Sequence, residues 1–174
     1  MTTNFITDAE KPELVITREF RAPRELVFQL WTEPEHLKQW WGPTGFDLGV
    51  SQLDLRPGGI FHYSMKSPDG FEMWAKFVYR EIEAPERIVY VNSFSDPEGN
   101  TIRAPFEGHE TWPLETLYTL TLSESDGITT VTLRGEPIHA TEEERRTYAA
   151  GFDSMKQGFG GTFDQLADYL ARVL

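Results

Sequence analysis

Apolar side chains recur every three or four positions between Thr141 and Leu174, the longest stretch of the chain that keeps a single period. This spacing places them on one face of an amphipathic helix. Thr141 and Glu144 have the spacing of a capping box, which satisfies amide groups in a first helical turn. The pattern predicts one long helix over 141–174. Its heavy apolar residues are Tyr148, Phe152, Met155, Phe159, Phe163, Leu166, Tyr169, Leu170 and Val173.

Glycines interrupt this predicted helix at Gly151, Gly158, Gly160 and Gly161. Each costs about 1 kcal/mol relative to alanine in a helix interior. Gly151, Gly158 and Thr162 fall together on one edge of the aromatic face, so that edge carries little side-chain volume. Two interpretations follow: a strand or loop approaches the helix backbone closely, or space beside the helix is left for a guest molecule.

The N-terminal part predicts a strand and two short helices. Residues 1–11 show no period and are expected to form a flexible lead-in, whereas 13–21 alternates as a strand does. Pro23 suits the first turn of a short helix. A second short helix follows, with Thr32 expected as its cap and Glu35 completing a capping box.

Between 46 and 136 the pattern changes to alternation of apolar and polar residues, broken by glycine and proline turns. Residues 101–113 form a loop in this interpretation, with room for a short strand. The element order predicts an α+β helix-grip fold, with six to seven antiparallel strands curved around the long C-terminal helix and a cavity between them. We expect residues 12–174 to form a single domain. The strands of this region are predicted at 46–55, 60–66, 71–82, 87–95, 114–123 and 128–136.

The amino-acid composition limits the classes of binding partner that the chain can have. A net charge of -12 and a pI near 4.7 argue against nucleic acid or an anionic membrane as the main partner. The chain has no cysteine, no signal-peptide pattern and no apolar run of membrane-spanning length, so a cytoplasmic protein without membrane insertion is expected. Its four histidines lack metal-ligand spacing, and we expect neither a metal nor a cofactor. A homodimer is left open.

Aromatic residues are the strongest candidates for function, because they make up 13% of the chain and gather on shared strand faces. Asn92, Thr116 and the tyrosine hydroxyls on the same faces need polar partners once buried. A mostly apolar pocket holding a few such polar groups is typical of a small-molecule site. The candidate cavity-lining residues are Trp41, Phe61, Tyr63, Met73, Phe77, Tyr90, Asn92, Tyr118, Phe152, Met155 and Phe159.

Adjacent tryptophans end the second short helix. Trp40 and Trp41 cannot both face the same side of one helix. We predict that Trp40, three residues after Leu37, packs inside and that Trp41 lies near the cavity mouth or on the surface.

Several motifs, in order, resemble one family over nearly the whole chain. They are Arg21-Ala22-Pro23, Trp31-Thr32-Glu33-Pro34-Glu35, Trp40-Trp41-Gly42-Pro43, Arg56-Pro57-Gly58-Gly59, Pro85-Glu86-Arg87-Ile88-Val89 and Gly158-Phe159-Gly160-Gly161-Thr162-Phe163. The family is the activator of heat-shock-protein-ATPase-like family of the START-like, or birch-pollen-allergen-like, helix-grip superfamily. The resemblance implies a lipophilic cavity between sheet and helix. Many relatives carry glycine at the position of Phe77, where an inward phenylalanine would narrow that cavity.

Three functions are compatible with these observations. The one we favour is non-enzymatic binding of a small hydrophobic or amphipathic molecule in the cavity. The second is a cyclase or hydrolase that uses Tyr63, Tyr118 or His109 as an acid or base. The third, implied by the family resemblance alone, is a chaperone-cofactor role in the stress response.

Overall fold

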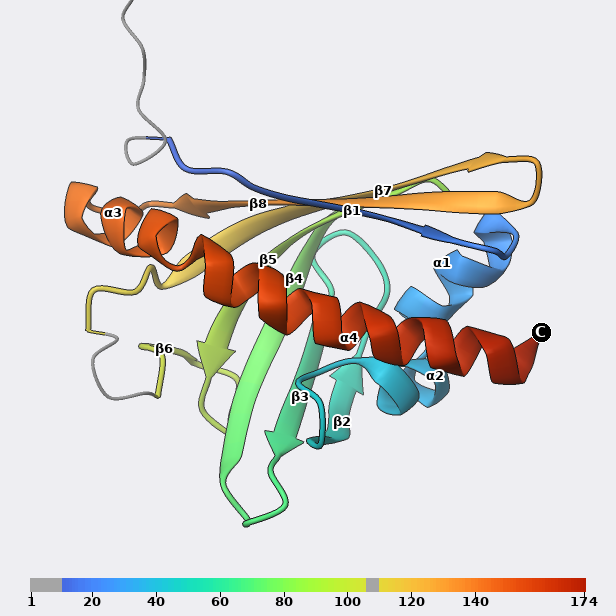
Figure 1. The fold of residues 1–174 in the computed structure, drawn as a ribbon. Coiled ribbons are helices and arrows are strands. Elements are labelled where there is room, and N and C mark those ends of the chain that lie inside the picture. The colour runs from blue at the N-terminus through green and yellow to red at the C-terminus, as the bar shows by residue number, and fades with distance from the viewer. Residues whose placement is uncertain (1–10, 106–109) are drawn as a thin grey trace, which may run out of the picture.

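A curved antiparallel sheet wraps around one face of a long C-terminal helix (Figure 1). The computed structural model describes residues 11–105 and 110–174. The strands are β1 (Leu14–Phe20), β2 (Asp47–Leu53), β3 (Ile60–Lys66), β4 (Glu72–Glu83), β5 (Arg87–Ser95), β6 (Thr101–Ile102), β7 (Glu115–Ser125) and β8 (Ile128–Ile138). The helices are α1 (Arg24–Thr32), α2 (Pro34–Trp40), α3 (Glu142–Ala150) and α4 (Phe152–Val173).

The strands lie in the order β1-β8-β7-β5-β4-β3-β2, with the short β6 paired to β5. All pairs are antiparallel, and consecutive strands from β2 to β5 and from β7 to β8 form hairpins. Helix α4 crosses the concave face of the sheet (Figure 1). Helices α1 and α2 lie near its C-terminal end, and α3 and β6 lie toward its other end. The predicted α+β helix-grip architecture is confirmed.

Alternation along the strands determines which side chains enter the core. On β4, Met73, Ala75, Phe77 and Tyr79 are all buried, while the residues between them are only half-buried. They form one hydrophobic cluster with side chains from α4. Successive side chains on a strand point to opposite faces. Since the buried set packs with α4, which crosses the concave face, the concave face is the buried one. The α4 residues of this cluster are Phe163, Leu166 and Leu170.

The C-terminal segment is two helices, not the single helix predicted over 141–174. The capping box at its start is confirmed, since the Thr141 side chain accepts from the Glu144 backbone N–H and the Glu144 carboxylate accepts from the Thr141 N–H. The helix is broken at Gly151, which separates α3 from α4. A Cβ atom at this glycine would lie 3.1 Å from the ring of Trp112. The break therefore lies where a distant aromatic side chain approaches the backbone.

Gly158 and Gly161 differ in their surroundings, so one interpretation does not explain both. A Cβ atom at Gly158 would have no atom within 4 Å, and this residue is exposed. Neither a pressing strand nor an enclosed guest space exists there. A Cβ atom at Gly161 would lie 3.1 Å from Oγ1 of Thr44, so close approach explains that glycine. The hydroxyl of Thr162 donates to the carbonyl oxygen of Gly42 and holds the segment after α2 against α4.

The predicted capping box at the start of α2 is wrong. Thr32 is the last residue of α1, and its hydroxyl donates to the Phe28 carbonyl oxygen at 2.9 Å. Glu33 is the N-cap of α2, and no side chain caps it. Pro34 explains why the N-cap is Glu33 and not Thr32. A residue before proline is pushed into an extended conformation, and an N-cap residue adopts that conformation.

The prediction that Trp40 packs inside is confirmed. Trp40 is 1% exposed, and its indole N–H donates to the Leu30 carbonyl oxygen at 2.9 Å. Trp41 is half-buried, with its ring 5.5 Å from that of Phe77. The strand predictions are confirmed to within a few residues. Across the described part of the chain, helices are too short or too polar to cross a membrane.

Candidate functional site

The middle of the sheet's concave face is packed with aromatic rings. Phe77 stacks on Tyr90 of the neighbouring strand with ring centroids 3.9 Å apart, and Tyr90 stacks in turn on Tyr118 at 5.4 Å. On β3, Phe61 and Tyr63 stack on each other and meet Phe77 edge-on. None of these five side chains is more than 7% exposed. Phe77 points inward, so its ring occupies space that a glycine would leave open.

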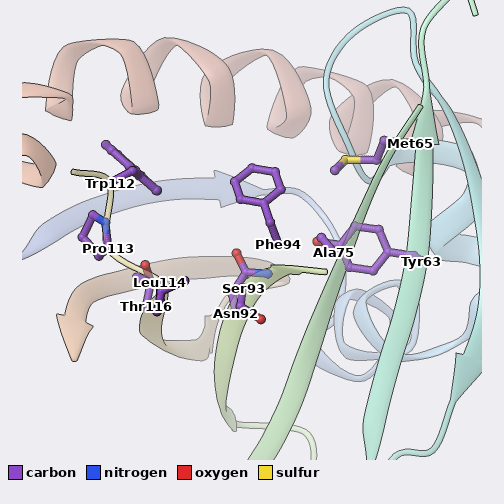
Figure 2. A pocket seen from close by; sticks show the side chains of 10 residues that line it. All are labelled: Tyr63, Met65, Ala75, Asn92, Ser93, Phe94, Trp112, Pro113, Leu114 and Thr116. Carbon is purple, nitrogen blue, oxygen red and sulfur yellow. The ribbon is translucent and has the colours of Figure 1, made fainter. Parts of the chain in front are cut away.

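A small hollow, here called the inner slot, lies beside this aromatic row at the α3 end of the sheet. Its volume is about 80 Å³. Figure 2 shows the Phe94 ring standing between Trp112 on one side and Tyr63 and Met65 on the other. The inner slot is lined by Tyr63, Met65, Ala75, Asn92, Ser93, Phe94, Trp112, Pro113, Leu114 and Thr116.

A larger hollow, here called the outer groove, opens next to the inner slot where α3 meets α4. Its volume is about 440 Å³, which lies within the range of small-molecule sites. Phe94 and Trp112 belong to the walls of both hollows, so the two hollows are adjacent. The outer groove is lined by Phe94, Ala104, Trp112, Thr147, Ala150, Gly151, Ser154 and Met155.

Polar contacts hold the Trp112 wall against α3. Arg103 donates to the carbonyl oxygen of Trp112 at 3.1 Å and forms an ion pair with Glu144. The hydroxyls of Thr111 and Thr147 lie 2.8 Å apart and share a hydrogen bond. These contacts join the segment that carries Trp112 to the helix that forms the opposite wall of the outer groove. The shape of the groove therefore depends on pairs distant in sequence.

Gly151 sets how closely the two walls approach. Its missing side chain lets the Trp112 ring reach the α3–α4 junction, since a Cβ atom there would lie 3.1 and 3.3 Å from two ring atoms. The same ring lies 5.4 Å from that of Tyr148 on α3. Glycine at this position thus allows both the helix break and the close approach of the Trp112 ring to the α3–α4 junction.

Uncharged side chains form the described walls of both hollows. No charged side chain appears among the described residues that line them. Burial raises the pKa of Tyr63 to about 12, although hydrogen bonds with the Trp41 and Asn92 side chains lower it in part. Burial also raises the pKa of Tyr118. Both phenols therefore stay protonated at neutral pH.

The residues predicted from sequence do not all lie in one place. Tyr63 and Asn92 line the inner slot, and Met155 lines the outer groove. Phe152 packs edge-on against Tyr148, and Phe159 against Tyr118. The remaining ones, which belong to the aromatic row or its neighbourhood in the core, are Trp41, Phe61, Met73, Phe77, Tyr90 and Tyr118. Their role in binding stays a prediction.

The structure adds wall residues that sequence reasoning did not select. Phe94 shares the parity of Tyr90 and Asn92, so the alternation of β5 places it on the same face. Trp112 and Ala104 lie in the segment 101–113, which has no period. Gly151 was recognised only as part of a glycine-bearing edge. Because the sequence predicted no helix break at Gly151, it could not predict the α3–α4 junction either.

The histidines are dispersed. Nδ1 of His36 lies 2.6 Å from the Tyr169 hydroxyl, and Nε2 of His62 lies 3.1 Å from the Ser95 hydroxyl. His109, the histidine considered for acid–base chemistry, lies outside the described residues. Within residues 11–105 and 110–174, no three histidine, aspartate or glutamate side chains are grouped so as to hold a metal ion.

Comparisons with known proteins place the chain among related sequences and folds. The family model described as Activator of Hsp90 ATPase homolog 1-like protein matches residues 21–171. A solved structure from Mycobacterium smegmatis is 25% identical with a TM-score of 0.74, covering 93% of this chain and 92% of that one. One from Arthrobacter aurescens is 24% identical with a TM-score of 0.77, covering 95% and 90%.

A protein from Silicibacter pomeroyi described as AHSA1 is 20% identical, has a TM-score of 0.67, and is matched over 93% of this chain and 99% of its own. The likenesses below 25% identity support the fold alone. No curated protein sequence matches the chain.

Proposed function

The chain belongs to the Activator of Hsp90 ATPase homolog 1-like family, and on that premise we propose that it binds a small, partly hydrophobic molecule in the outer groove. The observation that carries the proposal is the groove itself, with about 440 Å³ of space beside a core that is otherwise filled by aromatic rings. A mostly apolar concave surface with a few polar groups is the usual form of a small-molecule site.

The lining of the groove suits an apolar guest. Phe94, Trp112 and Met155 offer large apolar surfaces, and burial of apolar area is worth about 25 cal/mol per Å². Methionine is flexible and adapts to irregular shapes. Small residues at Ala104 and Ala150 leave the space open. The groove therefore favours a compact hydrophobic body over an extended polar one.

A groove-filling substitution tests the proposal. Ala150 on α3 is exposed and lines the groove, so Ala150→Phe should occupy part of the space without disturbing the core. Ala171→Phe is the matched control, because Ala171 is also an exposed alanine in a helix but does not line the groove. The probe is the neutral dye N-phenyl-1-naphthylamine, whose fluorescence rises in an apolar site.

We expect the wild type and the Ala171→Phe variant to bind the dye with similar affinity, and the Ala150→Phe variant to bind it at least tenfold more weakly. Circular dichroism confirms that all three are folded. Dye binding that is equal in the two variants, or absent from the wild type, would show that the groove is not the binding site.

The described residues favour neither of the two alternatives. Tyr63 and Tyr118 are buried phenols whose raised pKa values keep them protonated at neutral pH, so neither is available as a base there. The family name alone is the basis for a chaperone-cofactor role, and no feature of the outer groove supports it.

A further inference from the structure

We infer that the molecule held in the outer groove carries one small uncharged polar group, a hydroxyl or a primary amide, which enters the inner slot. This inference rests on the proposed function and adds the chemical class of the ligand. It follows from the adjacency of the two hollows, the polar groups of the inner slot and the neutrality of its walls.

Two adjacent hollows of different size suit a ligand with two different ends. Phe94 and Trp112 line both, so a molecule lying along these two rings extends from the larger space into the smaller one. Figure 2 shows both rings on the side of the strands that faces the helix. A cavity of about 10–15 Å³ is enough to hold one water molecule. The 80 Å³ of the inner slot therefore has room for a short functional group with a few attached carbons.

Polar groups in the inner slot come from three strands. Asn92 on β5 and Thr116 on β7 are direct cross-strand partners, so their side chains project side by side. The Asn92 amide donates to the Lys76 carbonyl oxygen at 3.0 Å, which fixes its orientation. The Tyr63 hydroxyl on β3 bonds to the same amide. This set offers hydrogen-bond donors and acceptors to a neutral group.

A charged group does not fit this set. The inner slot holds no cation to pair with a carboxylate and no carboxylate to pair with an ammonium group among its described lining residues. An ion buried without a partner loses its hydration and is strongly disfavoured. The net charge of -12 adds a general repulsion of anions. A fatty acid is thus a poor ligand, whereas the alcohol or amide of the same chain length is a good one.

The experiment compares probes that share one apolar tail. Decan-1-ol, decanamide, decanoate and decyltrimethylammonium compete with N-phenyl-1-naphthylamine at pH 8, the two neutral probes below their solubility limits and the two ions below their critical micelle concentrations. We expect the alcohol and the amide to displace the dye at concentrations at least tenfold lower than either ion. The cationic probe separates a preference for neutral groups from simple attraction to an acidic protein.

A hydroxyl-deleting variant places the polar group in the inner slot. Thr116→Val removes the hydroxyl at constant shape and should weaken decan-1-ol about fivefold, the loss of one hydrogen bond. Thr119→Val is the control, since Thr119 lies on the same strand but on the opposite face. As a measurement on the unaltered protein, the side-chain amide resonance of Asn92 should shift with decan-1-ol and not with decane.

The outcomes separate the two proposals. If the dye binds and decanoate competes as well as decan-1-ol, the neutral-group inference is overturned while binding in the groove stands. If Thr116→Val leaves decan-1-ol affinity unchanged, or the Asn92 resonance does not move, the polar group is not in the inner slot. If neither dye nor probes bind, the proposed function itself fails.

Discussion

The Phe77 ring lies flat against the Tyr90 ring, with centroids 3.9 Å apart and planes inclined by 17°. Phe77 also meets the rings of Trp41, Phe61 and Tyr63 edge-on, each at 5.7 Å or less. Edge contacts of this kind contribute beyond the apolar area that they bury. One side chain thus joins three neighbouring strands to the segment that follows α2.

Replacing Phe77 by alanine should cost about 3–5 kcal/mol in the free energy of unfolding, because a fully buried ring is lost and a cavity remains. Urea unfolding followed by circular dichroism measures the loss. Val78→Ala is the control, since the next residue points to the other face and is only half-buried. We expect it to cost about 1 kcal/mol. Similar losses in both variants would mean that Phe77 is not central to the core.

Alanine substitutions at two glycines of the C-terminal segment should have opposite effects. Gly158→Ala should stabilise the protein by about 0.5–1 kcal/mol, because the new methyl group meets open space and alanine has the higher helix propensity. Gly151→Ala should destabilise it by about 1–3 kcal/mol, because the methyl group forces the Trp112 ring to move. Thermal unfolding at one protein concentration compares the two. A stabilising Gly151→Ala would show that Trp112 does not depend on this glycine.

Those two glycines also show what the sequence could and could not predict. The fold could be predicted from local patterns. The capping box of Thr141 and Glu144 and the alternation of β4 each depend on residues close in sequence. The break at Gly151 lies against the ring of Trp112, which is distant in the chain, within a segment without any period. The sequence close to Gly151 does not show that the helix breaks there and continues through Gly158.

The candidate site was harder to predict than the fold for the same reason. Its walls form where α3, the α3–α4 junction and the segment ending at Trp112 meet, and long-range contacts such as Arg103 with Glu144 bring them together. Parity identified inward-facing residues such as Tyr63 and Asn92 correctly. It could not tell which of them border a hollow and which, like Phe61, pack against other rings, because that depends on side-chain volumes across several strands.

Stability in mild acid should depend on Glu144. Burial tends to raise the pKa of this carboxyl, but hydrogen bonds and charge from Arg103, together with the Thr141 backbone N–H, outweigh that effect and lower it. A lowered pKa in the folded state contributes stability that is present above the ordinary value of 4.5 and is lost as the pH falls below it. Glu144→Gln should therefore cost about 1–2 kcal/mol at pH 7 and progressively less below pH 4.5.

Urea unfolding of the wild type and the Glu144→Gln variant between pH 7 and pH 3 measures this difference. Glu142→Gln is the control, because Glu142 forms an exposed ion pair with Arg146 on the same helix. Exposed pairs contribute little, so this variant should track the wild type at every pH. A constant gap between wild type and Glu144→Gln across the range would contradict the assigned role of the ionised carboxylate.

Buried tyrosines should make the protein sensitive to alkali. Burial raises the pKa of Tyr63 from 10.0 to about 12 and also raises the pKa values of Tyr79, Tyr90, Tyr118 and Tyr148. A raised pKa in the folded state gives stability that is complete below pH 10 and is lost as the pH rises through the folded value. In the unfolded chain these phenols ionise near pH 10, so rising pH favours unfolding.

Each such tyrosine should lower the free energy of unfolding by about 1.4 kcal/mol per pH unit between its two pKa values. Tyr63→Phe therefore should reduce the steepness of the decline between pH 10 and pH 12 by about that amount per pH unit. Phenolate absorbance at 295 nm and circular dichroism, followed in the same titration, should change together, because these phenols ionise only when the core opens. Thr119→Val, which removes a non-titrating hydroxyl from the outer face, should leave the slope unchanged. Ionisation of several tyrosines near pH 10 with the circular dichroism intact would show that the aromatic row is open to solvent, contrary to the packed core described above.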